Sequence, residues 1–262
     1  HRYYTFEFFR RINEEASQAV NRLGSPGRVS CYPFTQHFII WPGANQRHGN
    51  SFYWYHRLSP VVNVEHCWPE APVMNLNYAI TDRLAPRHRN TVMGWIWFYF
   101  GQEGHDQYNG PHDMDRALAR MMGHTVDGTH HWLYSPRYRS RDQKQRLQIA
   151  YWQNFFKAHY AGFLAKSAPV RPQIALLMPD TTGYFYRYFQ YPKQDFGWTA
   201  EALQNLQYPW HLLTEEEIEL GETKLGDYKA LYVVGSEWST PTIRQRIAEF
   251  IAGGGVVFAN VD

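Results

Sequence analysis

Cysteine is nearly absent from this sequence, which holds only Cys31 and Cys67 among its 262 residues. Two isolated cysteines cannot supply a four-cysteine zinc site or the disulfide framework of a small secreted domain. We therefore interpret both as small side chains buried in a core. Two buried cysteines do not distinguish an oxidising from a reducing environment, so the cellular compartment is not predicted.

An excess of charge of either sign is also missing. Lys and Arg number 26 against 24 Asp and Glu, which gives a net charge of +2. Domains that bind nucleic acid usually gather basic residues on one face, so we expect no nucleic-acid partner. The basic run at residues 137–146 is interpreted as the solvated start of a helix.

Long apolar runs are missing as well. No run approaches the ~18 apolar residues needed to span a bilayer, and the start of the chain has no signal-peptide pattern. We therefore expect no membrane partner. Because 44% of the residues are hydrophobic and 19% are charged, the chain can still build a packed globular core.

Aromatic residues are what the sequence has in excess: 10 Trp, 19 Tyr and 16 Phe make up 17% of the chain. Large flat side chains fill cores, and they also line pockets that accept apolar faces of ligands. The enrichment points weakly toward carbohydrate.

The first part of the chain alternates strand and helix patterns. Hydrophobic periodicity predicts helices over residues 3–23 and 140–166. Strands are predicted over residues 28–34, 61–68, 91–100 and 129–135. This alternation favours parallel strands joined by crossover helices. A complete (β/α)8 TIM barrel takes roughly 250 residues, so residues 1–167 suffice for about its second half.

A second α/β unit is predicted after the proline-containing linker at residues 168–172. Its strands are expected at residues 174–178, 210–213, 230–234 and 256–259, and its helices at 198–206 and 240–252. The pattern is that of a doubly wound, flavodoxin-like domain over residues 173–262. The chain begins with His1 and breaks off after a strand pattern, so we expect an interior segment of a longer protein.

Glu103 is the strongest candidate for a catalytic group. The apolar run at residues 93–100 is predicted to be a buried strand, and it passes directly into Gly101, Gln102, Glu103 and Gly104. In α/β barrels the active site lies at the carboxyl ends of the strands. Glycosidic bond cleavage usually requires two carboxylates, and a strand end would hold one of them rigidly.

Glu65 is the other carboxylate that a predicted strand of the barrel-like part carries in a similar position. It could be the second catalytic carboxylate, or it could orient Glu103. The alternative is a structural glutamate paired with neighbouring Arg or His side chains.

Several histidines lie close together in the sequence, namely His105, His112, His124, His130 and His131. A zinc site would need three or four convergent ligands, and no HExxH spacing is present. We therefore expect no metal and no cofactor. Hydrogen bonding to sugar hydroxyls is the role expected of His105 or His131.

Aromatic residues alternate along two of the predicted strands: Trp97, Tyr99, Trp132 and Tyr134. Core packing is the default interpretation of such a pattern. Because Trp132 lies near the end of its strand, it is the best candidate for a wall of a sugar pocket, with Trp97 beside it.

Two glycine-containing segments of the second unit could also carry chemistry. Ser236 follows a predicted strand between Gly235 and Glu237, but the motif is not GxSxG. A hydrolase centred on Ser236 is one alternative function. Residues 253–255 are all glycine and lie between a helix and a strand, which predicts a helix cap and turn rather than a phosphate-binding loop.

Three stretches of the chain together resemble a known family. WIWFYFGQEG is similar to a seventh barrel strand that ends in a nucleophilic glutamate, and MDRALARMMGHTVDGTHHWLYS is similar to the helix, turn and eighth strand that follow. QIALLMPD and KALYVVGSEWSTPTIRQRIAEFIAGGGVVFANVD are similar to the β-galactosidase trimerisation domain, which has a glutamine-amidotransferase-like fold. The sequence therefore resembles clan A glycoside hydrolases, with family 42 β-galactosidases nearest.

The resemblance implies a retaining, β-galactosidase-like glycoside hydrolase in which Glu103 is the nucleophile. The family's acid/base residue would lie upstream of His1. Carbohydrate would be the substrate, and the second domain would support a homotrimer. The family's usual Trp-Arg pair is Trp132-Leu133 here, which motivates the alternative of a catalytically inactive, carbohydrate-binding barrel. The other alternative is an amidotransferase-like hydrolase at Ser236.

Overall fold

The computed structural model describes parts of the chain in detail. These are residues 2–24, 30–31, 52–55, 61–66, 91–97, 130–134, 147, 150–151, 154–155, 158–164, 166, 170–185, 193–206 and 208–260. Of the helix predicted over residues 140–166, this part includes several helical positions and α8 (Ala161–Leu164).

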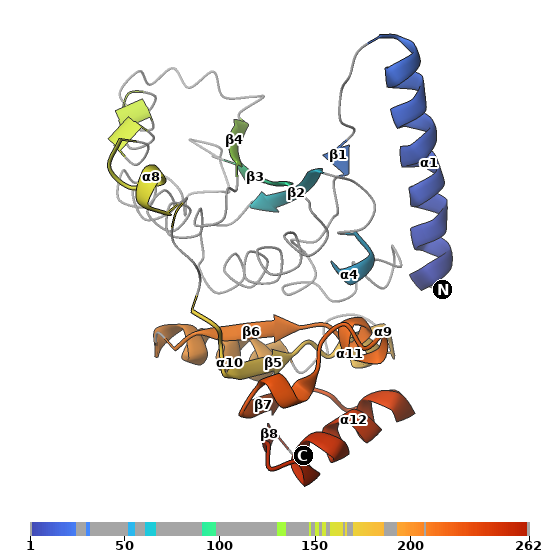
Figure 1. The fold of residues 1–262 in the computed structure, drawn as a ribbon, viewed down its shortest axis with the longest axis vertical. Helices are drawn as coiled ribbons and strands as arrows, with labels where there is room; N and C mark the ends of the chain where they lie inside the picture. The colour runs from blue at the N-terminus through green and yellow to red at the C-terminus, as the bar shows by residue number, and fades with distance from the viewer. Residues whose placement is uncertain are drawn as a thin grey trace, which may run out of the picture.

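The first unit contains a parallel sheet whose strands follow one another in chain order (Figure 1). The strands are β1 (Ser30–Cys31), β2 (Val61–His66), β3 (Thr91–Trp97) and β4 (His130–Tyr134). Each pairs in parallel with its neighbours in the order β1-β2-β3-β4. Each strand lies within a range predicted from hydrophobic periodicity, and the predicted parallel pairing is confirmed.

Helix α1 (Arg2–Arg22) has nearly the predicted bounds. It ends where Gly24 adopts a left-handed conformation with φ of 72° and donates its N–H to Asn21 O at 3.0 Å. On its surface, Arg10 forms ion pairs with Glu7 at 2.8 Å and with Glu14. Local propensity and capping therefore account for where this helix ends.

The second unit contains a parallel sheet with a different strand order, β6-β5-β7-β8. Its strands are β5 (Ile174–Leu177), β6 (Trp210–Leu213), β7 (Ala230–Val233) and β8 (Val256–Ala259). Numbered within the unit, the order is 2-1-3-4. The chain first adds a strand on one side of β5 and then crosses back to the other, so the direction of winding reverses between β5 and β7.

Both faces of the second sheet are covered, because successive residues of a strand point to opposite faces. Leu176 and Met178 pack in one core cluster with Phe196, Ala200 and Leu203 of α10 (Lys193–Asn205). The opposite cluster contains Ala175, Leu177, Ile218, Ile243 and Phe250, and it draws on α11 (Glu215–Glu219) and α12 (Pro241–Ala252). Fully burying a leucine stabilises a fold by about 1.5–3 kcal/mol, so these two clusters hold the sheet between its helices.

Four elements of the second unit differ from prediction. Helix α10 begins at Lys193, before the predicted start at residue 198, because burial of Phe196 outweighs the weak helix propensity of Gly197. Helices α9 (Asp180–Phe185) and α11 were not predicted, and neither was the short 3-10 helix η3 (Leu225–Asp227). By contrast, α12 has the predicted Pro241 at its first turn, and the Thr240 side chain accepts the N–H of Ile243.

None of the described helices is both long enough and apolar enough to cross a bilayer.

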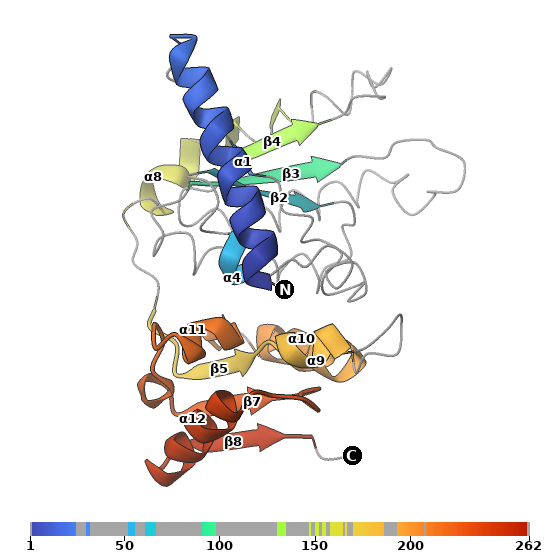
Figure 2. The same cartoon turned by 90° about the vertical axis from the view of Figure 1, so that its right-hand side faces the viewer.

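The two units meet at α4 (Phe52–Tyr55), which lies on the side of the first unit that faces the second (Figures 1 and 2). Tyr53 is fully buried, and its hydroxyl donates to Glu222 Oε1 at 2.6 Å. The ring of Tyr53 also meets Trp54 edge-on at 5.0 Å between centroids. A side chain from the first unit is therefore anchored on the turn that follows α11.

Candidate functional site

Glu65, Trp95 and Trp132 occupy one row across the first sheet. Glu65 of β2 is in register with Trp95 of β3, which is in register with Trp132 of β4. Residues paired in a parallel sheet lie on the same face, and faces alternate along each strand. Two of the predicted site residues, Glu65 and Trp132, therefore share a face and a row.

Trp97 and His131 are separated by the same register. Trp97 lies two residues after Trp95 on β3 and pairs with Tyr134. Because faces alternate along a strand, Trp97 belongs to the same face as Trp95, Glu65 and Trp132. His131 pairs with Gly94 and belongs to the opposite face. The predicted site residues on the strands thus divide into one set of three on a shared face and His131 on the other.

The carboxyl ends of β2 and β3 lie at the same edge of the sheet because the strands are parallel. Glu65 is the residue before the last of β2, and Trp97 is the last of β3. From Trp97 the chain continues to Glu103 and His105, which lie outside the described residues. Their position at this edge stays a prediction.

At the carboxyl edge of the second sheet, Thr182 bonds the backbone of Trp238. Its hydroxyl donates to Trp238 O at 2.9 Å and accepts from Trp238 N at 2.8 Å. Thr182 follows β5 and Trp238 follows β7, the two strands between which the winding reverses. Ligand sites of open α/β sheets lie at this type of position. Here the Thr182 side chain joins helix α9 to the backbone of the loop after β7.

Ser236 lies in the same edge, on the loop after β7. Its Oγ is buried and has no hydrogen-bond partner in the part of the chain that the structure describes. A serine nucleophile needs a neighbouring base. His211 is the single histidine of residues 173–262, and its Nδ1 lies 2.9 Å from the hydroxyl of Tyr228, which precedes β7. The described residues therefore bring no imidazole to Ser236.

Two buried glutamates at this edge, Glu215 and Glu217, were not predicted from the sequence. Glu215 accepts the N–H of Thr181 at 2.9 Å and also its hydroxyl. Glu217 accepts the N–H of Thr214 at 2.9 Å, and Thr214 in turn accepts the N–H of Glu217. This reciprocal pattern is a capping box. Its Thr-x-x-Glu spacing was visible in the sequence and could have predicted α11.

Asn260 links this edge to α10. Its Oδ1 accepts the N–H of Gly235 at 3.0 Å, and its Nδ2 donates to Asp195 Oδ2 at 2.9 Å. Gly235 has a positive φ of 69°, which a side chain would strain. Within the described residues, no group of three or more His, Cys, Asp or Glu side chains is arranged to hold a metal ion.

The described residues form an α/β protein with two parallel sheets, and a comparison with known proteins finds distant structural neighbours. No protein-family model matches the chain, and no curated protein sequence matches it. Among solved structures, the chain is similar to an alpha-L-fucosidase isoenzyme 2 from Paenibacillus thiaminolyticus, a glycosidase, at 14% identity and a TM-score of 0.45. The similarity covers 72% of this chain, which spans 27% of the length of that fucosidase.

Proposed function

We propose that the protein containing this chain is a retaining glycoside hydrolase in which Glu103 is the nucleophile. The observation that supports this best is the parallel pairing of β2 and β3 in the first sheet. Glu65 lies near the carboxyl end of β2, and β3 runs toward the same edge before the chain continues to Glu103. Active sites of parallel α/β barrels lie at this edge. A glycosidase needs two carboxylates there, and this part of the sequence supplies two candidates.

In the proposed reaction, a carboxylate oxygen of Glu103 attacks the anomeric carbon while the bond from that carbon to the leaving oxygen breaks. A second carboxylic acid gives its proton to the leaving oxygen. The resulting glycosyl ester on Glu103 is then attacked by water, whose proton passes to the second carboxylate, and Glu103 is released. Two inversions at the anomeric carbon retain its configuration.

The other residues have separate roles in this proposal. Glu65 is the second carboxylate or the group that orients Glu103. Trp97 and Trp132, which belong to one face of the sheet, offer flat surfaces to the C–H face of a sugar ring. His105 would hydrogen-bond sugar hydroxyls, whereas His131 lies on the opposite face of the sheet and is left out of the proposed site. The proposed specificity is β-galactosidase-like.

The proposal extends to the architecture. Strands that pair in parallel in chain order are what half of a (β/α)8 barrel requires. The 2-1-3-4 order of the second sheet agrees with the first four strands of a flavodoxin-like domain. A homotrimer held by this second domain is the proposed assembly.

The decisive variant is Glu103→Gln, which keeps the shape of the side chain and removes its charge. We expect hydrolysis of 4-nitrophenyl β-D-galactopyranoside to fall by about 10³-fold or more, because the covalent step loses its nucleophile. In Glu103→Ala, added azide should take the place of the carboxylate and yield a glycosyl azide of inverted configuration, detectable by NMR.

Glu15→Gln on the exposed face of α1 is the matched control and should leave turnover unchanged. Near-wild-type turnover by Glu103→Gln would refute the assignment of the nucleophile. Absence of turnover by the unmodified protein on a panel of aryl glycosides, together with saturable sugar binding, would instead favour a carbohydrate-binding barrel without catalysis. The Leu133 that follows Trp132 motivates that second candidate.

A further inference from the structure

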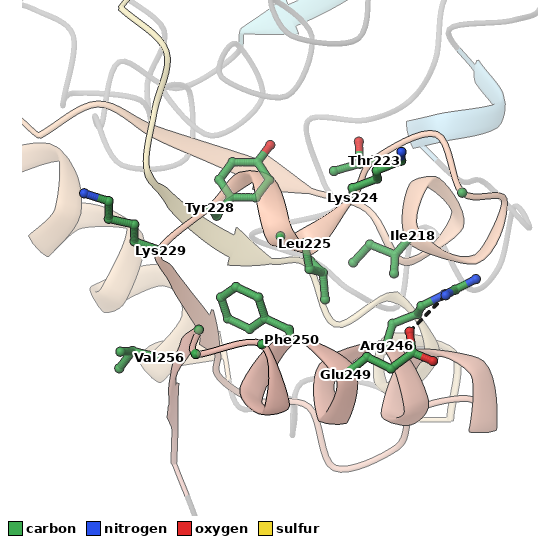
Figure 3. Close-up of a pocket in the computed structure, with 15 residues that line it drawn as sticks. Ile218, Thr223, Lys224, Leu225, Tyr228, Lys229, Arg246, Glu249, Phe250 and Val256 are labelled. Atoms are coloured by element: carbon green, nitrogen blue, oxygen red, sulfur yellow. Dashed lines mark hydrogen bonds and ion pairs between the residues drawn. The ribbon is translucent and has the colours of Figure 1, made fainter.

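A cavity of about 770 Å³ opens in the second unit, on the side away from the carboxyl edge of its sheet. It is formed by α11, η3, the second half of α12 and the residues that lead into β7 and β8 (Figure 3). Val256, the first residue of β8, donates its N–H to Lys229 O at 3.0 Å and so joins the two strand entrances beside the cavity. The volume is in the range of small-molecule sites, about 300–1,000 Å³.

The floor of this cavity is apolar and well packed. Ile218, Leu225 and Phe250 are 2%, 6% and 6% exposed, and all three belong to one core cluster. Gly255 leaves room for the ring of Phe250, since a Cβ on Gly255 would lie 2.3 Å from Phe250 Cε2 and Cζ. The floor is therefore fixed in place by the core beneath it, and it suits the apolar body of a ligand.

The rim of the cavity is cationic. Lys229 lies on one side beside Val256, and Lys224 and Arg246 lie on the opposite side (Figure 3). Arg246 forms an ion pair with Glu249 at 2.9 Å. Among the described residues, neither Lys224 nor Lys229 has an ion-pair partner. Both lysines are exposed at the rim, so their flexible side chains can reach an acidic group of a ligand.

Glu249 is the acidic residue among those that line the cavity, and the neighbouring Asp227 is paired with Arg171 at 3.1 Å. The hydrogen bond from Arg246, followed by one from Gln245, lowers the pKa of Glu249, so this carboxylate stays charged and bound to Arg246 near neutral pH. The C-terminal end of α12 contributes roughly half a negative charge. Two full positive charges exceed that contribution, so the site favours an anion.

From this geometry we propose that the cavity binds an organic anion with a flat or compact apolar body and one acidic group, such as a carboxylate, sulfonate or phosphate. The apolar body rests on Ile218, Leu225 and Phe250, and the acidic group meets Lys224 or Lys229. This inference is independent of the proposed glycosidase function, because it uses none of the residues of the first sheet.

The test compares two probes that differ in one group. 1-Anilinonaphthalene-8-sulfonate carries an acidic group on an aromatic body, and N-phenyl-1-naphthylamine is the same body without it. In fluorescence titrations of the whole chain, the sulfonate should bind saturably at one site per chain. Removal of both ammonium groups in the double variant Lys224→Ala/Lys229→Ala should weaken it about tenfold, because the sulfonate loses its charge-assisted contact with whichever lysine it meets.

The neutral probe should bind this double variant as it binds the unmodified chain. Lys166→Ala, which removes an exposed lysine outside the cavity, should leave both titrations unchanged. Equal sulfonate affinity with and without Lys224 and Lys229 would overturn the proposal. So would displacement by equimolar inorganic sulfate, which would mean an anion site that ignores the apolar floor. Loss of binding as the chain self-associates would instead assign this face to contacts between copies.

Discussion

Thr182 is a single side chain that joins helix α9 of the second unit to the loop after β7. It is fully buried and makes two hydrogen bonds with the backbone of Trp238. Helix α9 follows β5 and the loop follows β7, the two strands between which the winding of the sheet reverses. Because a threonine hydroxyl can donate and accept at once, one residue satisfies both backbone groups of its partner.

We predict that Thr182→Val destabilises the chain by about 1–3 kcal/mol, because a shape-conserving change removes both hydrogen bonds and leaves polar groups behind. The measurement is the urea midpoint of unfolding. Thr242→Val, on the exposed surface of α12, is the control and should stay within about 0.5 kcal/mol. Equal midpoints for the two variants would show that other contacts hold α9 and the loop after β7 together.

At the residue scale, local sequence shows which side chains could react but not which partners they meet in the fold. The prediction from sequence has one such case and one omission. It named Ser236 as a candidate nucleophile because serine follows a strand there, but the position of His211 beside Tyr228 depends on how β6 and β7 are placed in the sheet. It did not find the buried Glu215, because a glutamate looks like a surface residue until its partner Thr181 is brought beside it. Burial of polar groups is decided by partners distant in the chain.

The turn at residues 253–255 is the element that connects α12 to β8. Gly253 caps the helix, and Gly254 has a positive φ of 90°. The N–H of Gly255 bonds Phe250 O at 2.9 Å, which places this glycine directly against the Phe250 ring. The predicted cap and turn are confirmed, and the third glycine is explained by packing rather than by backbone conformation.

We predict that Gly255→Ala costs about 1–3 kcal/mol, because the added Cβ would overlap the buried Phe250 ring and force the core to shift. Thermal or urea unfolding measures the loss. Gly226→Ala is the matched control, since a Cβ at that position meets no atom within 4 Å. If the two alanine variants had the same free energy of unfolding, the close contact between residue 255 and the Phe250 ring would not limit stability.

At the scale of the whole molecule, the contact between Tyr53 and Glu222 joins the two units. The phenol is fully buried, and its hydroxyl reaches a carboxylate on the turn after α11. Its position outside both sheets means that neither sheet needs it to form. The contact therefore acts on how the units are held together rather than on the fold of either one.

We predict that Tyr53→Phe loosens this junction at a cost of about 1.5–3 kcal/mol, the range for hydrogen bonds to charged groups. Hydrogen exchange followed by mass spectrometry should become faster in peptides that contain residues 52–55 and 220–223, while peptides from β5 and β7 keep their protection. Tyr208→Phe, at an exposed tyrosine, is the control. Unchanged exchange at the junction would refute a joining role for Tyr53.

The sequence by itself determined the strands and the main helices, because apolar periodicity and capping residues act over a few neighbouring positions. Helix α1, strand β2 and helix α12 lie where their residues predict them. Only the tertiary structure decided which predicted site residues share a face. Register places Glu65, Trp95 and Trp132 in one row and puts His131 on the other face. Register is fixed by pairing between distant segments. The cavity beside Phe250 arises in the same way, from helix and strand ends that meet only after folding.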